Sequence, residues 1–211
     1  MCIGTLSIIE SCNLKFVISS LLIAICLLLD VLDGFIARLL NVESEYGKQL
    51  DSFSDLVAFG LAPGVLMYNF INFSLNEISL AYVAMLIPIF SSLRLSKYNL
   101  EAKKNKFNGI TTPVSAILFI SLPLINNYEK NEKIISFFIN PQTICIMIII
   151  ISYLLICSFE TFSIRIEAIK NDKRKLTFMF ICLSILYIFK FSGLPMVVLI
   201  YIILSKFKII N

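Results

Sequence analysis

The sequence predicts an all-α fold, a polytopic membrane helical bundle with about seven spanning helices plus a truncated N-terminal helix. Of its 211 residues, 58% are hydrophobic and only 15% are charged, and the mean hydropathy of +0.90 lies outside the range of soluble globular domains. Several apolar stretches approach the roughly 20 residues that a helix needs to cross a bilayer core. No long polar linker divides the chain, so residues 1–211 are expected to form a single membrane domain.

The apolar stretches give the positions of the expected helices. We place the spanning helices at 16–38, 49–72, 78–97, 112–126, 134–158, 176–191 and 194–206. Residues 2–9 are apolar but too short to cross a bilayer, and we expect them to be the end of a helix that begins before this chain. In the second span, Gly60, Pro63 and Gly64 predict a bend or a close contact with another helix.

The basic residues predict the orientation of the bundle. If the seven spans alternate in direction, one side collects 14 of the 18 lysines and arginines, and the positive-inside rule makes that side cytoplasmic. The net charge of +4 then follows from topology and from attraction to anionic lipids, and it requires no nucleic-acid partner. The 14 residues are Arg38, Lys48, Arg94, Lys97, Lys103, Lys104, Lys106, Arg165, Lys170, Lys173, Arg174, Lys175, Lys206 and Lys208.

Cysteine and histidine usage narrows the chemistry that is open to the chain. The sequence has no histidine, which removes the commonest general base and the commonest transition-metal ligand. The six cysteines show no metal-ligand spacing, so we interpret them as packing residues in a reduced setting. Carboxylates must therefore carry any acid-base or metal chemistry. The cysteines are Cys2, Cys12, Cys26, Cys145, Cys157 and Cys182.

Four aspartates lie at the ends of two successive apolar helices, where acidic groups are costly. Asp30 and Asp33 are about 60° apart on the first helix, and Asp51 and Asp55 are about 40° apart on the second. Because the connection is short, the two helices are expected to be adjacent and antiparallel, with their acidic faces opposed. Oxygen ligands in this number suit Mg²⁺ or Mn²⁺, and we expect two such ions.

Small residues continue the acidic faces. Gly34 and Ala37 follow Asp30 and Asp33 along one stripe, and Gly47 shares a face with the second pair of acids. These positions leave room for a phosphate-bearing ligand between the helices. The alternative is ordinary close packing of membrane helices, for which glycine and alanine are common.

The whole pattern Asp30-x2-Asp33-Gly34-x2-Ala37-Arg38-x8-Gly47-x3-Asp51-x3-Asp55 resembles the signature of the CDP-alcohol phosphatidyltransferase family. The resemblance implies that the four aspartates bind two divalent cations and that Asp55 is the general base. It also implies that a set of residues holds the CDP group: Asp30, Asp33, Gly34, Ala37, Arg38 and Gly47. The alternative to a functional motif is an accidental cluster of interfacial acids.

Other segments resemble the bacterial, membrane-embedded serine branch of this family. They are the runs at 46–63, 94–99, 107–116 and 159–165. The chain has Ser52 where the glycerol phosphate branch typically has proline, and it departs from the serine branch at Ile110 and Thr111.

The resemblance implies transfer of the phosphatidyl group of CDP-diacylglycerol to L-serine, giving phosphatidylserine and CMP, in the bacterial cytoplasmic membrane with the active site facing the cytoplasm. We expect Arg94 to bind the serine carboxylate or a phosphate. The alternative is that Arg94 only contributes to the positive charge on the cytoplasmic side. Glycerol 3-phosphate or an inositol phosphate is the alternative acceptor, and a membrane cation carrier is an alternative from another class. Family members resemble homodimers, although nothing in the sequence specifies an interface.

Overall fold

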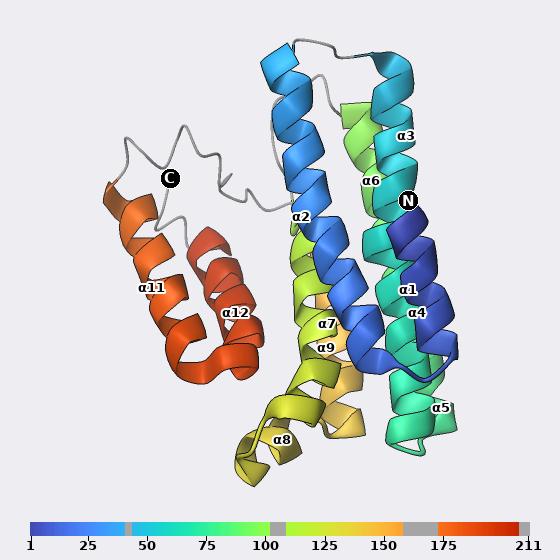
Figure 1. Ribbon diagram of the computed structural model, residues 1–211, viewed down its shortest axis with the longest axis vertical. Helices are drawn as coiled ribbons and strands as arrows, with labels where there is room; N and C mark the ends of the chain where they lie inside the picture. Colours follow the sequence, from blue (N-terminus) through green and yellow to red (C-terminus); the bar gives the residue numbers. More distant parts are fainter. Residues whose placement is uncertain (41–43, 102–108, 158–172, 207–211) are drawn as a thin grey trace.

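A computed structural model describes residues 1–40, 44–101, 109–157 and 173–206 (Figure 1), and within these ranges the chain is helical with no strand. Two stretches are π-helical, η1 (Leu56–Leu61) and η2 (Phe70–Ser74), and two are 3₁₀, η3 (Tyr82–Met85) and η5 (Lys190–Ser192). The α-helices are α1 (Cys2–Cys12), α2 (Phe16–Leu40), α3 (Glu45–Asp55), α4 (Ala62–Asn69), α5 (Ile78–Ala81), α6 (Leu86–Glu101), α7 (Thr112–Tyr128), α8 (Glu132–Phe138), α9 (Pro141–Ile156), α11 (Lys173–Phe189) and α12 (Gly193–Lys206).

The predicted number of seven spans is not confirmed. Among the described residues, four helical segments are long and apolar enough to cross a membrane: 16–36, 46–74, 78–100 and 180–205. A fifth arises if α8 and α9, which are bent by 52° relative to each other, count as one span. The predicted span at 112–126 corresponds to α7, whose 17 residues fall just short of a full crossing. The predicted spans at 176–191 and 194–206 correspond to α11 and α12, which are 17 and 14 residues long. The segment 180–205 qualifies by length and composition, although it contains the reversal between these two shorter helices.

The surface of the bundle is apolar. Large hydrophobic side chains are exposed along several helices, including Leu28, Val31, Phe180, Tyr187 and Ile188, each more than half exposed. An apolar surface of this extent is typical of contact with lipid. Together with the long apolar helices, it makes this chain an integral membrane protein.

The first helix is attached to the bundle through small and polar residues. On α1, the Ser7 hydroxyl donates to the backbone carbonyl of Ser19 at 3.0 Å and lies 2.9 Å from its hydroxyl oxygen. The Asn69 amide of α4 donates to Ser11 Oγ at 3.1 Å. In an apolar environment, such hydrogen bonds between helices help to fix their mutual positions.

Gly60 and Gly64 lie at a close contact between η1–α4 and α6, as the sequence predicted. A Cβ atom added at Gly60 would lie 2.9 Å from the Ser91 Cβ, and one added at Gly64 would lie 2.7 Å from the Pro88 Cδ. Only residues without a side chain allow this approach. The segment that carries Asp51 and Asp55 is therefore fixed against α6.

The C-terminal helices form a hairpin that lies against α7 (Figure 1). Lys190 has a φ angle of 49° at the reversal between α11 and α12. Ser192 Oγ donates to the Glu129 carboxylate at 3.0 Å, and the rings of Tyr128 and Phe191 stack with centroids 5.2 Å apart. These contacts attach the turn of the hairpin to the end of α7.

Successive long helices alternate in direction in Figure 1, as the sorting of the basic residues assumed. The end of α2, the start of α3 and the end of α6 lie at one end of the bundle in Figure 1, and Arg94 and Lys97 lie in the last turns of α6. Several of the other basic residues, including Lys103, Lys104, Lys106, Arg165 and Lys170, lie outside the described residues, as does the segment 159–165.

Candidate functional site

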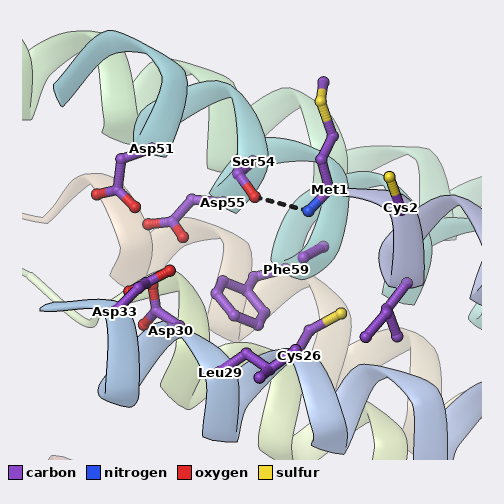
Figure 2. Close-up of a pocket in the computed structure, with 12 residues that line it drawn as sticks. Met1, Cys2, Cys26, Leu29, Asp30, Asp33, Asp51, Ser54, Asp55 and Phe59 are labelled. Carbon is purple, nitrogen blue, oxygen red and sulfur yellow. Dashed lines mark hydrogen bonds between the residues drawn. The ribbon is translucent and has the colours of Figure 1, made fainter. Parts of the chain in front are cut away.

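Two helices bring the predicted aspartates together. Asp30 and Asp33 lie in the second half of α2, and Asp51 and Asp55 lie in α3, which is separated from α2 by four residues. The α3 helix is started by Ser44, whose side chain accepts a hydrogen bond from the backbone N–H of Gly47 at 3.0 Å. Figure 2 shows the side chains of the two acidic pairs directed toward one another across the space between the helices. The predicted convergence of the acidic faces is confirmed.

Three of the four carboxylates form a compact set. One oxygen atom from each of Asp30, Asp51 and Asp55 lies within 4.8 Å of the others. Asp30 and Asp55 are half-buried and Asp51 is exposed. Carboxylate oxygens at this spacing fit a hard divalent cation, which neutralises charges that otherwise repel one another at the membrane edge. The carboxylate of Asp33 lines the same space but stands outside this set.

A cavity of about 320 Å³ joins the acidic set to an apolar wall. The four aspartates line one part of it, and the other part is formed by side chains of α1, α2 and η1 (Figure 2). The cavity therefore offers charged and apolar surfaces side by side, as a molecule with an anionic head and an apolar body requires. The remaining lining residues are Met1, Cys2, Ile3, Cys26, Leu29, Ser54, Ala58 and Phe59.

Gly34 and Gly47 of the motif are not among the described residues that line the cavity. A Cβ atom added at Gly34 would meet no other atom within 4 Å, so open space adjoins this position. Gly47 is exposed in the first turn of α3. Ala37 and Arg38 belong to α2, but their side chains lie outside the described part of the structure. The predicted contact of these four residues with a CDP group stays a prediction.

Arg94 lies in α6, the helix against which the acid-bearing segment packs. Its side chain is only 9% exposed, and its Nε has no hydrogen-bond partner among the described residues. The guanidinium lies within electrostatic range of Tyr98, Asp55 and Tyr201. A buried arginine beside an acidic site can bind an anionic group of a ligand through its planar fork of donors.

Sequence reasoning missed two features of the site. Ser52 and Asn99 exchange hydrogen bonds of 3.1 and 3.2 Å, which connect the acidic turn of α3 to α6. The π-helical stretch η1 begins directly after Asp55, and π-helical turns are frequent at functional sites. In the sequence, only the presence of two polar residues in membrane-spanning segments could have indicated the Ser52–Asn99 pair. For the π-helical stretch, the nearby Gly60 indicated no more than an irregular helix.

Comparison with known proteins agrees with this geometry. The family described as CDP-alcohol phosphatidyltransferase matches residues 1–208. A CDP-diacylglycerol–serine O-phosphatidyltransferase of Helicobacter pylori is 35% identical over 128 residues, which cover 59% of this chain and 54% of that protein. The enzyme of the same name from Bacillus subtilis is 34% identical over 144 residues, covering 68% and 73%. An archaetidylserine synthase of Methanothermobacter thermautotrophicus is 33% identical over 132 residues, covering 60% and 55%.

The extent of these matches differs. The chain spans about half the length of the Helicobacter and Methanothermobacter relatives, whereas the family match runs through all the described helices. That match includes both acid-bearing helices and the C-terminal hairpin. The match over nearly the whole chain shows that this protein belongs to the CDP-alcohol phosphatidyltransferase family.

Proposed function

We propose that this protein transfers the phosphatidyl group of CDP-diacylglycerol to L-serine, producing phosphatidylserine and CMP. The observation that carries the proposal is the convergence of Asp30, Asp51 and Asp55 from two neighbouring helices in a chain of this family. The choice of serine is supported by the names of the relatives, two of which are serine phosphatidyltransferases and one an archaetidylserine synthase.

The proposed reaction is a substitution at phosphorus. The serine hydroxyl oxygen forms a bond to the phosphorus that carries diacylglycerol, and the bond from that phosphorus to the oxygen of the CMP phosphate breaks. CMP leaves with the bonding electron pair, and the hydroxyl proton is lost. Asp55 is proposed to orient this hydroxyl and to accept its proton; its half-buried position among the other acids supports this role.

The aspartates are proposed to hold two divalent cations, Mg²⁺ or Mn²⁺. Asp30, Asp51 and Asp55 supply the compact ligand set, and Asp33 lines the same cavity. Bound cations would supply positive charge that neutralises the pyrophosphate and the developing charge on the leaving oxygen. The motif residues Gly34, Ala37, Arg38 and Gly47, together with Asp30 and Asp33, are proposed to bind the CDP group.

Arg94 is proposed to bind the carboxylate of serine. This role is supported by its burial, by its Nε, which has no partner among the described residues, and by its electrostatic interaction with Asp55. A guanidinium matches a carboxylate through two parallel hydrogen bonds. The reacting hydroxyl would then lie on the side of the serine that faces Asp55.

The cytoplasmic membrane of a bacterium is the proposed location, with the acidic end facing the cytoplasm. The distribution of basic residues supports this orientation, since 14 of the 18 fall on one side when the predicted spans alternate. CMP and serine are water-soluble, so an active site at this end gives them direct access from the cytosol.

The proposed function can be tested with purified protein in lipid nanodiscs that contain CDP-diacylglycerol. CMP release is measured with Mn²⁺ or Mg²⁺ and with labelled serine, glycerol 3-phosphate or an inositol phosphate as acceptor. We expect serine to enter the lipid with release of one CMP per serine. Incorporation of glycerol phosphate but not serine would overturn the acceptor assignment, and cation uptake into liposomes without CMP release would favour a carrier.

A further inference from the structure

The acid-bearing segment and α6 meet along one antiparallel interface. A Cβ atom added at Gly60 would lie 2.9 Å from the Ser91 Cβ, and Ser52 and Asn99 are joined by hydrogen bonds. Ser52 precedes Gly60 by the same number of residues as Asn99 follows Ser91. The two contacts therefore fit a single register, and on α6 they lie about 12 Å apart.

The two contacts differ in the packing that surrounds them. Around Gly60, η1 packs closely against α6. Further out, the extensive contacts of α3 with other described elements are those with η1, which continues it along the chain. Helix α3 therefore extends beyond the closely packed part of the bundle, and the Ser52–Asn99 pair connects this outer part to α6.

The hydrogen bonds of this pair restrict the orientation of both side chains. Ser52 Oγ accepts a hydrogen bond from the amide nitrogen of Asn99 at 3.1 Å. The hydroxyl hydrogen of Ser52 has two acceptors in reach, the Asn99 amide oxygen at 3.2 Å and the backbone carbonyl of Lys48 at 3.0 Å. Because an amide holds its donor and its acceptor in one plane, the pair limits the rotation of α3 about its own axis.

The rotation of α3 decides where its aspartates point. Ser52 follows Asp51 by about 100° around the helix, whereas Asp55 lies only about 40° from Asp51. The serine is bonded to α6, and the two aspartates approach Asp30 of α2, with carboxylate oxygens within 4.8 Å of one another. Without a cation these like charges repel each other, so a contact on the far side of α3 opposes a force that would turn or displace the helix.

We infer that Asn99 of α6 is a positioning residue for the proposed cation site. Through Ser52 it holds the outer part of α3, so that Asp51 stays within reach of the other two ligands. Neither Asn99 nor Ser52 is among the described residues that line the cavity, which fits a role behind the site. The inference rests on the proposed function, because it assumes that the acidic set binds Mg²⁺ or Mn²⁺.

The test measures Mn²⁺ binding to the purified protein in nanodiscs from the EPR signal of the free ion, so it does not depend on turnover. Asn99→Ala should raise the Kd for Mn²⁺ by about tenfold, the lower end of the effect of residues that orient metal ligands. Ser52→Val should have the same effect, whereas Ser52→Thr, which has the shape of valine and keeps the hydroxyl, should bind Mn²⁺ as the unaltered protein does. Ser92→Ala is the matched control, because the Ser92 hydroxyl donates to the carbonyl of Ile89 within α6.

Thermal unfolding separates positioning from a purely structural role. A structural role would lower the midpoint of Asn99→Ala equally in EDTA and in Mn²⁺, whereas a loss of positioning also makes the increase with Mn²⁺ smaller than in the unaltered protein. The KM for serine at saturating Mn²⁺ should stay unchanged.

An unchanged Kd for Mn²⁺ in Asn99→Ala, or equal Kd values in Ser52→Thr and Ser52→Val, would overturn the inference. So would an unaltered protein that binds no Mn²⁺. If the unaltered protein binds Mn²⁺ but releases no CMP with any acceptor, the proposed function fails, and the Mn²⁺ measurements still decide the role of Asn99.

Discussion

Replacing Asp51 by asparagine should change the stability of the protein in opposite directions with and without divalent cation. In the cation-free protein, Asp51 lies within 4.8 Å of the carboxylates of Asp30 and Asp55. Each such pair of charges costs about 0.9 kcal/mol at the dielectric constant of water and about 3.5 kcal/mol at an effective value of 20. Because Asp51 is exposed, the lower figure applies, and the two pairs together give about 2 kcal/mol.

Asp51→Asn removes this repulsion, so the cation-free variant should be the more stable protein. For a chain of this size, about 2 kcal/mol corresponds to an increase of about 4–8 °C in the thermal midpoint. With Mn²⁺ the order reverses, since a site filled at 100 times its Kd adds about 2.7 kcal/mol to the unaltered protein. The variant lacks the Asp51 carboxylate as a metal ligand, so it loses most of the stabilisation by Mn²⁺. Its transferase activity should fall by at least about 100-fold.

The measurement is a thermal unfolding series in EDTA and in rising Mn²⁺, with CMP release measured on the same samples. Glu77→Gln serves as the control. Glu77 is exposed just beyond the far end of the segment 46–74, so this substitution removes one negative charge without changing the acidic set. About 1 M salt should shrink the gain of Asp51→Asn in EDTA, since the Debye length then falls to about 3 Å. Equal midpoints in EDTA, together with an unaltered response to Mn²⁺, would refute the cation site.

Three further predictions follow from contacts described above. Gly60→Ala should lower stability by about 1–3 kcal/mol in thermal unfolding, because its Cβ would lie 2.9 Å from the Ser91 Cβ; Gly34→Ala, where the space is open, should preserve stability and raise only the KM for CDP-diacylglycerol. Asn99→Ala should cost about 0.5–1.5 kcal/mol by loss of its hydrogen bonds to Ser52, with no additional loss in the double variant with Ser52→Ala. The pKa of Glu129 lies below its usual 4.5, because its carboxylate accepts hydrogen bonds from the backbone N–H groups of Lys130 and Asn131 and, with a smaller effect, from the hydroxyl of Ser192. Its contribution to stability is therefore present above that value and lost as the pH falls through the lower, folded-state pKa, so Glu129→Gln should flatten the pH dependence of unfolding between about pH 5 and pH 3.

The acidic site was largely predictable from the sequence. Carboxylates at an interval of three or four residues share one face of a helix, and a short connection leaves two successive helices adjacent and antiparallel. These two rules place Asp30 and Asp55 opposite each other without knowledge of any other part of the fold. The close contact at Gly60 was predictable for a similar reason, since small residues in membrane helices mark close approach.

The number of spans was not predictable in the same way. Hydropathy identifies apolar segments, but it does not determine whether a segment of 14 to 17 residues, such as α7 or α12, crosses the membrane by itself. The bend between α8 and α9 depends on local backbone geometry at Asn140 and Pro141. The packing of α12 against α7 was likewise inaccessible, because it joins helices that are distant in the sequence.

The attachment of the C-terminal hairpin has a consequence for how the protein can diversify. The acidic set is held by α2 and α3, and the α3 segment is fixed against α6 by Gly60 and Gly64. The hairpin, by contrast, lies along α7. The acid-bearing helices and the C-terminal hairpin therefore rest on different supports. Substitutions in the hairpin can accumulate with little effect on the geometry of the acidic set, so the two parts of the bundle can change independently.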